Sequence, residues 1–110
     1  MSRELLGTFE LTVILSIIRL GDEGYGVAIC EAIEAATQRP VVVASVYAAL
    51  DRLERKGFVV SQLGESTAER GGRAKRYFRV TAEGLRQVRE VKRGLTRLWR
   101  GLPELAGESV

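Results

Sequence analysis

The sequence contains no histidine and one cysteine, and both shortages narrow what the protein can do. Without histidine, the chain lacks the commonest general base and metal ligand of proteins. A single cysteine, Cys30, excludes an internal disulfide and a zinc site built from several cysteines. We therefore expect a cytoplasmic protein without a metal or other cofactor. Because no basic residue stands close to Cys30 in the sequence, we expect a small buried side chain there rather than a reactive thiol.

Long apolar runs are also missing. The longest run, residues 11–18, is interrupted by Thr12 and Ser16 and is far shorter than the roughly 20 residues that cross a bilayer. Glu4 and Glu10 do not fit the layout of a secretory signal peptide. The sequence therefore predicts a protein with no membrane partner.

Positive charge is scarce in one part of the chain and concentrated in another. Residues 70–100 hold 11 of the 17 Lys and Arg residues and 2 of the 14 Asp and Glu residues. This segment is strongly basic and the rest of the chain is acidic. Such a division favours a polyanionic partner for the basic segment, although a solvated arginine-rich helix face would give the same count.

Hydrophobic residues make up 45% of the 110 residues, which is enough for the core of one small domain. Residues 4–20 predict a first helix that is apolar on nearly all sides, so part of it needs a second subunit to cover it. A second helix is expected over residues 25–37, broken by residues 38–40. The β-branched residues 41–43 predict a strand fragment that pairs with a later hairpin.

The second half of the chain alternates helix, strand, loop and strand. Residues 44–56 predict a helix that ends at Gly57, with Val42 at its cap position. Strands are expected over residues 58–63 and 75–81, joined by a polar loop, and Thr81 can cap a last helix. The predicted fold is mainly α with a small β-hairpin (α+β): a winged helix-turn-helix over residues 1–81, a dimerisation helix over 82–102, and a flexible tail over 103–110.

The last helix carries apolar residues in a heptad pattern. They recur at steps of 3, 4, 3, 4 and 3 residues: Val88, Val91, Leu95, Leu98, Leu102 and Leu105. Such a seam is usually covered by a partner helix, although it could pack on its own domain. We expect a homodimer whose interface comprises Leu5, Phe9, Val13, Val88, Val91, Leu95, Leu98 and Trp99.

Catalytic chemistry has little support in the sequence. Asp51 and Glu54 alternate with basic residues, which indicates salt bridges, and no serine has a base near it in sequence. Gly71 and Gly72 are not followed by the Lys-Ser or Lys-Thr of a nucleotide-binding loop. The sequence therefore predicts that the protein is not an enzyme.

Nucleic-acid binding is better supported. The helix over residues 44–56 begins with small side chains, which allow a helix to approach base edges in a major groove ~12 Å wide. Glycines and arginines in the loop suit phosphates or a narrow groove. Tyr47 could contact DNA or belong to the core. The predicted DNA-binding residues are Ala44, Ser45, Tyr47, Ala48, Arg52, Arg70, Gly72, Arg73, Lys75, Arg76 and Tyr77.

The sequence resembles the PadR-type transcriptional regulators over roughly residues 5–98. The resemblance rests on LGTFEL at residues 6–11, YGVAI at 25–29, VYAALDRLERKG at 46–57 and GGRAKRYFRVTAEG at 71–84. The order and spacing of these four motifs are specific, and the short length is similar to the compact branch of the family. The hairpin sequence is similar to a bacterial subgroup often encoded beside transporter permeases.

The resemblance implies a homodimeric winged-helix repressor on a palindromic operator, sometimes released by a small aromatic or hydrophobic effector. In some members a tryptophan of the last helix stacks on that effector. The candidate effector residues here are Trp99, Leu95 and Phe9. The alternative is a winged-helix module that binds a protein partner and no DNA.

Overall fold

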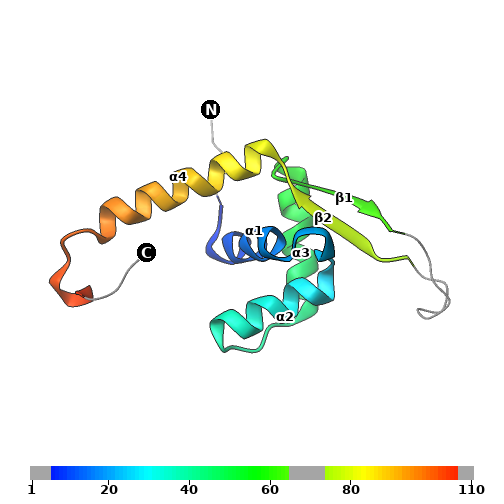
Figure 1. Ribbon diagram of the computed structural model, residues 1–110, viewed down its shortest axis with the longest axis horizontal. Coiled ribbons are helices and arrows are strands. Elements are labelled where there is room, and N and C mark those ends of the chain that lie inside the picture. Colours follow the sequence, from blue (N-terminus) through cyan, green and yellow to red (C-terminus); the bar gives the residue numbers. More distant parts are fainter. Residues whose placement is uncertain (1–5, 65–73, 107–110) are drawn as a thin grey trace.

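The computed structural model describes residues 6–64 and 74–106 (Figure 1). Its elements in chain order are α1 (Thr8–Leu20), the 3-10 helix η1 (Gly21–Glu23), α2 (Gly26–Thr37), α3 (Val43–Arg55), β1 (Val59–Leu63), β2 (Arg76–Val80), α4 (Ala82–Trp99) and the 3-10 helix η3 (Pro103–Leu105). The first three helices pack together, the β1–β2 hairpin projects from one side, and α4 extends away on the other. The predicted class, mainly α with one antiparallel hairpin, is confirmed.

One core joins the three helices to the hairpin. It consists of Val13, Ile14, Ile17, Ile29, Cys30, Ile33, Val46, Ala49, Leu50, Leu53, Phe58, Val59 and Phe78. In α3 the buried residues Val46, Leu50 and Leu53 follow the helical period, so one face of this helix is covered and the other is free. Cys30 is buried as predicted, and burial raises the pKa of its thiol.

The ends of α3 and α4 are set by local chemistry that the sequence predicted. Gly57 follows α3 with a φ of 81°, a conformation that glycine adopts without strain. The Thr81 hydroxyl oxygen accepts a hydrogen bond of 3.0 Å from the Gly84 N–H and caps α4. A Cβ atom at Gly84 would lie 2.3 Å from the Phe58 carbonyl oxygen, so glycine allows α4 to start against the turn after α3.

The strand predicted over residues 41–43 is wrong. The Val41 N–H donates to Glu34 Oε2 at 2.7 Å, and the Val41 carbonyl accepts from Cys30 Sγ at 3.2 Å. Side chains of α2 therefore occupy the backbone groups that a strand would use. The free edge of β2 is joined instead by the segment before α2, where the Phe78 N–H donates to the Gly24 carbonyl and Tyr25 forms a bridge with Tyr77.

The first helix also differs from its prediction. It begins at Thr8 rather than at residue 4, after Gly7 in an extended conformation, and Leu5 lies outside the described residues. Val13 was expected at a dimer interface, but it is fully buried in the core of one chain and has no surface left for a partner. The exposed apolar residues of α1 are instead Leu15 and Ile18.

A buried carboxylate links α1 to the end of α3. Glu10 is 4% exposed and receives the Gly7 N–H at 2.7 Å, Arg52 Nε at 3.1 Å and Lys56 Nζ at 2.8 Å. Burial alone would raise the pKa of Glu10, but the hydrogen bonds from Gly7, Lys56 and Arg52 outweigh it and hold this pKa below its ordinary value. The carboxylate is therefore ionised and fixes the distance between the two helices.

Much of the apolar side of α4 has no cover in one chain. Leu95 and Leu98 are exposed, the latter by 75%, and Leu102 and Leu105 are also exposed. Helix α4 ends at Trp99, and Pro103–Leu105 forms a short 3-10 turn where the sequence predicted a flexible tail. In the described part of the chain, no helix has the length and apolar character needed to span a membrane.

The Glu10 link generates a prediction about stability. Replacing Glu10 with Gln leaves the Lys56 ammonium, which is 16% exposed, without its buried counter-charge. We expect Glu10→Gln to lower the free energy of unfolding at pH 7 by roughly 3 kcal/mol, measured by urea denaturation. The control Glu83→Gln removes the partner of Arg86 in an exposed pair and should cost less than about 1 kcal/mol.

The same link sets a pH dependence. Since the folded pKa of Glu10 lies below its unfolded value, its contribution is present above about pH 4.3 and is lost as the pH falls through the folded pKa. Stability of the wild type should decline more steeply than that of Glu10→Gln over this range. Parallel curves for the two proteins would contradict the assignment.

Candidate nucleic-acid interface

The outward face of α3 carries small side chains at its start. Ala44, Ser45, Tyr47, Ala48 and Arg52 are all exposed, as the sequence predicted for a recognition helix. Val42 is the N-cap residue and makes no side-chain hydrogen bond there. With no bulky group except Tyr47 in its first turns, this face allows close approach of another surface.

Tyr47 occupies a position between the two roles considered for it. Its side chain is 48% exposed, and its ring lies over Gly26, where a Cβ atom would come within 2.2 Å of Cζ and the hydroxyl oxygen. Among the described residues its hydroxyl has no hydrogen-bond partner. The ring is therefore held by α2, while the hydroxyl remains available to a ligand.

An aromatic cluster stands at the base of the hairpin, on the other side of the Tyr25-Gly26 step. Lys75 Nζ lies 3.6 Å from the centre of the Tyr25 ring, and the Tyr25 and Tyr77 rings meet edge to face at 5.6 Å. These contacts hold the Lys75 ammonium in place without neutralising it, because a ring carries no charge. The start of α2 therefore joins Tyr47 of α3 to Lys75 and Tyr77 of the hairpin.

Arg76 points to the opposite face of the hairpin. Its Nη1 atom donates to Ser61 Oγ at 3.0 Å, and Ser61 Oγ donates to Glu54 Oε2 at 2.7 Å. Phe78, two residues further on the same face, is buried in the core, as the alternation of the strand predicted. Arg76 is exposed and lies beside the end of α3.

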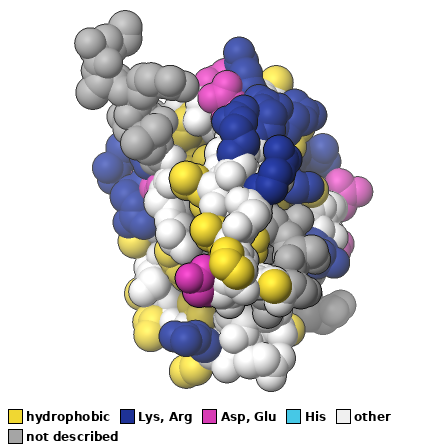
Figure 2. Space-filling model, turned by 90° about the vertical axis from the view of Figure 1, so that its left-hand side faces the viewer, with side chains coloured by type: hydrophobic (Ala, Val, Ile, Leu, Met, Phe, Trp, Pro, Cys, Tyr) yellow, Lys and Arg dark blue, Asp and Glu magenta, His cyan; other side chains and the backbone are white. Residues whose placement is uncertain are grey.

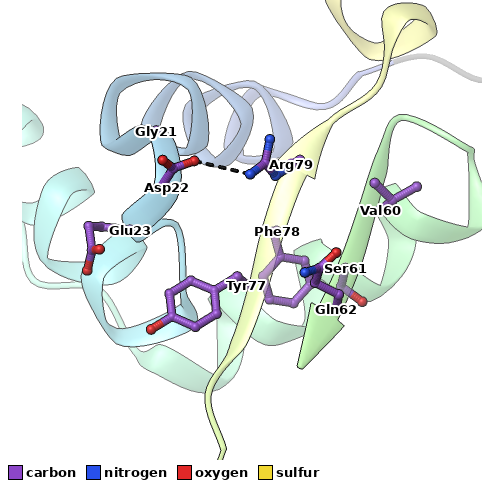
Figure 3. A pocket seen from close by; sticks show the side chains of 9 residues that line it. All are labelled: Gly21, Asp22, Glu23, Val60, Ser61, Gln62, Tyr77, Phe78 and Arg79. Carbon is purple, nitrogen blue, oxygen red and sulfur yellow. Dashed lines mark hydrogen bonds and ion pairs between the residues drawn. The ribbon is translucent and has the colours of Figure 1, made fainter. Parts of the chain in front are cut away.

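The outer face of the hairpin borders a small hollow of about 250 Å³ (Figure 3). The hollow is lined by Gly21, Asp22, Glu23, Val60, Ser61, Gln62, Tyr77, Phe78 and Arg79. Arg79 Nη2 donates to Asp22 Oδ1 at 3.1 Å across it. Because Asp22 offsets the charge of Arg79, this face offers less to an anion than the base of the hairpin does.

Arg52 is the predicted DNA-binding residue with the most buried partner. Its Nε atom is paired with Glu10, while the side chain remains 48% exposed. One turn away, Arg55 pairs with Asp51 on the surface of α3, which confirms the predicted salt-bridge pattern. Glu10 thus orients Arg52 at the edge of the exposed face.

Three predicted DNA-binding residues, Arg70, Gly72 and Arg73, lie outside the described residues. Sequence reasoning missed two contributors: Tyr25, which supports Lys75, and Glu10, which orients Arg52. Glu10 could have been found from its position, since it is a lone carboxylate within an otherwise apolar stretch of helix. No comparable signal marked Tyr25, because its partners are about 50 residues away in the sequence.

The candidate effector residues are not gathered in one pocket of a single chain. Phe9 lines a hollow of about 510 Å³ beside α3, with Pro40, Val41, Val42, Ser45, Ala48 and Arg52. Leu95 and Trp99 lie near the far end of α4. The indole N–H of Trp99 is buried and lacks an acceptor among residues 6–64 and 74–106. Those same residues contain no cluster of side chains that could hold a metal ion.

Comparisons with known proteins agree with this geometry. The sequence matches the Transcriptional regulator PadR-like family over residues 14–90, and no curated protein matches it. A transcriptional regulator from Clostridium thermocellum is 26% identical, with a TM-score of 0.69 over 89% of this chain and 90% of that one. A PadR family regulator from Eggerthella lenta is 28% identical, with a TM-score of 0.66 over 92% and 89%.

A PadR-like regulator from Bacillus cereus, 21% identical, shares the fold with a TM-score of 0.72 over 94% of this chain and 95% of that one. The matched family and the relatives described by function are transcriptional regulators and not enzymes. The family match covers well over half of the sequence. The chain therefore belongs to the PadR-like family of transcriptional regulators.

Proposed function

We propose that the protein is a homodimeric, sequence-specific DNA-binding repressor that acts in the cytoplasm on a palindromic operator. The observation that carries the proposal is the connection of an exposed, small-residue face of α3 to the cationic base of the hairpin through Tyr25 and Gly26. The start of α3 would enter the major groove, and Lys75 would contact phosphate beside it.

The dimer is supported by the exposed seam of α4. Two copies that cover Leu95 and Leu98 would remove large apolar side chains from water. A two-fold dimer presents two recognition helices, so its operator would contain two inverted half-sites about 34–36 Å apart. Val88 packs against the core of its own chain and would contribute less to this interface.

An effector would bind near Trp99, whose buried N–H lacks an acceptor among the described residues. A buried unpaired donor costs free energy, and an acceptor on a small aromatic or hydrophobic molecule would relieve that cost. Leu95 would supply apolar contact there. Phe9 could join this site only from a partner chain or after a rearrangement, since in one chain it lines the hollow beside α3.

The function is tested by sequencing genomic fragments that the pure protein retains. We expect enrichment of a short inverted repeat, with binding that weakens steeply as salt is raised, because counterions are released from phosphates. Retention of no preferred sequence, together with salt-independent binding of a protein partner, would favour the alternative of a protein-interaction module.

The interface of the dimer is tested by Leu95→Glu with Leu98→Glu. Wild-type protein at micromolar concentration should sediment at twice the chain mass of 12.1 kDa, and the double variant should sediment as a monomer because the two carboxylates cannot be buried. The control Val60→Glu with Leu63→Glu places the same charges on exposed apolar positions of the hairpin and should remain dimeric. A dimeric seam variant, or a monomeric wild type, would contradict the interface.

The role of the hairpin is tested by Lys75→Ala with Arg76→Ala. Because phosphate contacts carry no sequence information, this variant should weaken specific and random duplexes alike and reduce the salt slope by roughly one unit for each lost contact. Arg19→Ala with Arg79→Ala removes the same charge elsewhere and should leave both quantities near wild type. A wild-type slope in the first variant would show that the base of the hairpin does not contact DNA.

The role of Tyr47 is tested by Tyr47→Phe and Gly26→Ala. Loss of a hydroxyl that binds DNA should cost on the order of 1 kcal/mol of operator affinity while the free energy of unfolding changes little. The methyl group of Gly26→Ala should displace the ring from its position over α2 and also lower operator affinity. If the folded Tyr47→Phe dimer binds the operator as wild type does, the hydroxyl makes no contact with DNA.

A further inference from the structure

Helix α4 carries a second concentration of positive charge, away from α3 and the hairpin. Five basic side chains and one threonine line a shallow hollow of about 490 Å³: Arg89, Lys92, Arg93, Thr96, Arg97 and Arg100. Figure 2 looks onto the end of the molecule to which α4 extends and shows Lys and Arg side chains gathered over its upper part. We refer to these six residues as the basic stripe.

The basic stripe and the apolar seam lie on opposite sides of α4. With 3.6 residues per turn, the centre of the stripe is about 180° around the helix from the centre of the seam formed by Val88, Val91, Leu95 and Leu98. A partner that covers the seam therefore leaves the stripe facing outward. From Arg89 to Arg100 the stripe is about 16 Å long, at 1.5 Å per residue.

No carboxylate within the described part of the chain pairs with the five cations of the stripe. One turn earlier, the charge of Arg86 is offset by Glu83 in an ion pair. The hollow of the stripe contains no acidic and no large apolar side chain. Five cations held this close together repel one another, and an anionic ligand would relieve the repulsion.

We propose that the basic stripe binds the phosphodiester backbone of duplex DNA, as a contact separate from the one made by α3 and the hairpin. Guanidinium groups suit phosphate oxygens because their planar donors can bind two oxygens at once. A row of arginines about 16 Å long matches the continuous line of charge along a duplex. The stripe offers no group that reads base edges, so this contact is independent of sequence.

Two features favour DNA over other polyanions. A helix that lies on an anionic membrane inserts its apolar side, but on the proposed function that side of α4 is covered by the partner chain. A stable protein interface is usually anchored by apolar or aromatic side chains at its centre, and the stripe has none. A long polyanion needs neither, since its affinity comes from phosphate contacts.

The test compares Arg93→Gln/Arg97→Gln with a matched control, Arg19→Gln/Arg86→Gln, which removes the same charge outside the stripe. Binding of random-sequence and enriched genomic duplexes of 40 base pairs is measured by fluorescence anisotropy at several salt concentrations. The stripe variant should bind both duplexes on the order of tenfold more weakly, with a salt slope smaller by about 1.8. The ratio of the two affinities should not change, and Arg93→Lys/Arg97→Lys should recover most of the binding.

Circular dichroism and sedimentation establish that each variant keeps its helices and its assembly state. A stripe variant with wild-type affinity and slope would overturn the proposal, and so would an equal loss in the control. Loss of binding to anionic phospholipid vesicles with unchanged DNA binding would assign the stripe to a membrane surface and also overturn it. Lys75→Ala/Arg76→Ala separates the two claims: if only this variant weakens binding, the stripe proposal fails while the proposed function stands.

Discussion

The buried carboxylate of Glu10 is the interaction on which the arrangement of this molecule most depends. It binds the backbone at the start of α1 and two cations at the end of α3, with less than a twentieth of its surface exposed. A buried charge of this kind costs several kcal/mol unless its partners are in place, so alternative positions of α3 relative to α1 are excluded. The exposed face of α3 and the start of α4 inherit their positions from that constraint.

The second constraint is the short segment Gly24-Tyr25-Gly26. It adds a backbone hydrogen bond to the edge of β2, supports Lys75 through the ring of Tyr25, and gives Tyr47 a surface without a side chain. One turn of backbone thus coordinates the recognition helix with the hairpin. Elements that bind one ligand together must be held at a fixed spacing, and this segment provides that spacing.

The features that sequence could predict are those decided by near neighbours. The spacing of Val46, Leu50 and Leu53, the stop at Gly57 and the cap at Thr81 depend on residues within a turn or two, and the structure confirms them. The exposed face of α3 followed directly from its buried face. The exposed seam of α4 was predicted for the same reason, because its period is contained within one helix.

The features that sequence could not predict are decided by distant residues. Residues 41–43 have the composition of a strand, but Glu34 and Cys30 take their backbone groups. Val13 was placed in an interface because a helix apolar on all sides does not reveal which side faces its own core. Tyr25 gained its role only when folding brought it to Lys75 and Tyr77.

Membership of the PadR-like family establishes a transcriptional regulator, and the geometry indicates how it would engage DNA. The central claim is that two copies of α3 and its hairpin bind one duplex symmetrically. Hydroxyl-radical footprinting of an enriched genomic fragment tests it most directly. The account predicts two protected regions related by a dyad, with centres about 10 base pairs apart. A single asymmetric region, or no protection at concentrations where the protein is dimeric, would contradict it.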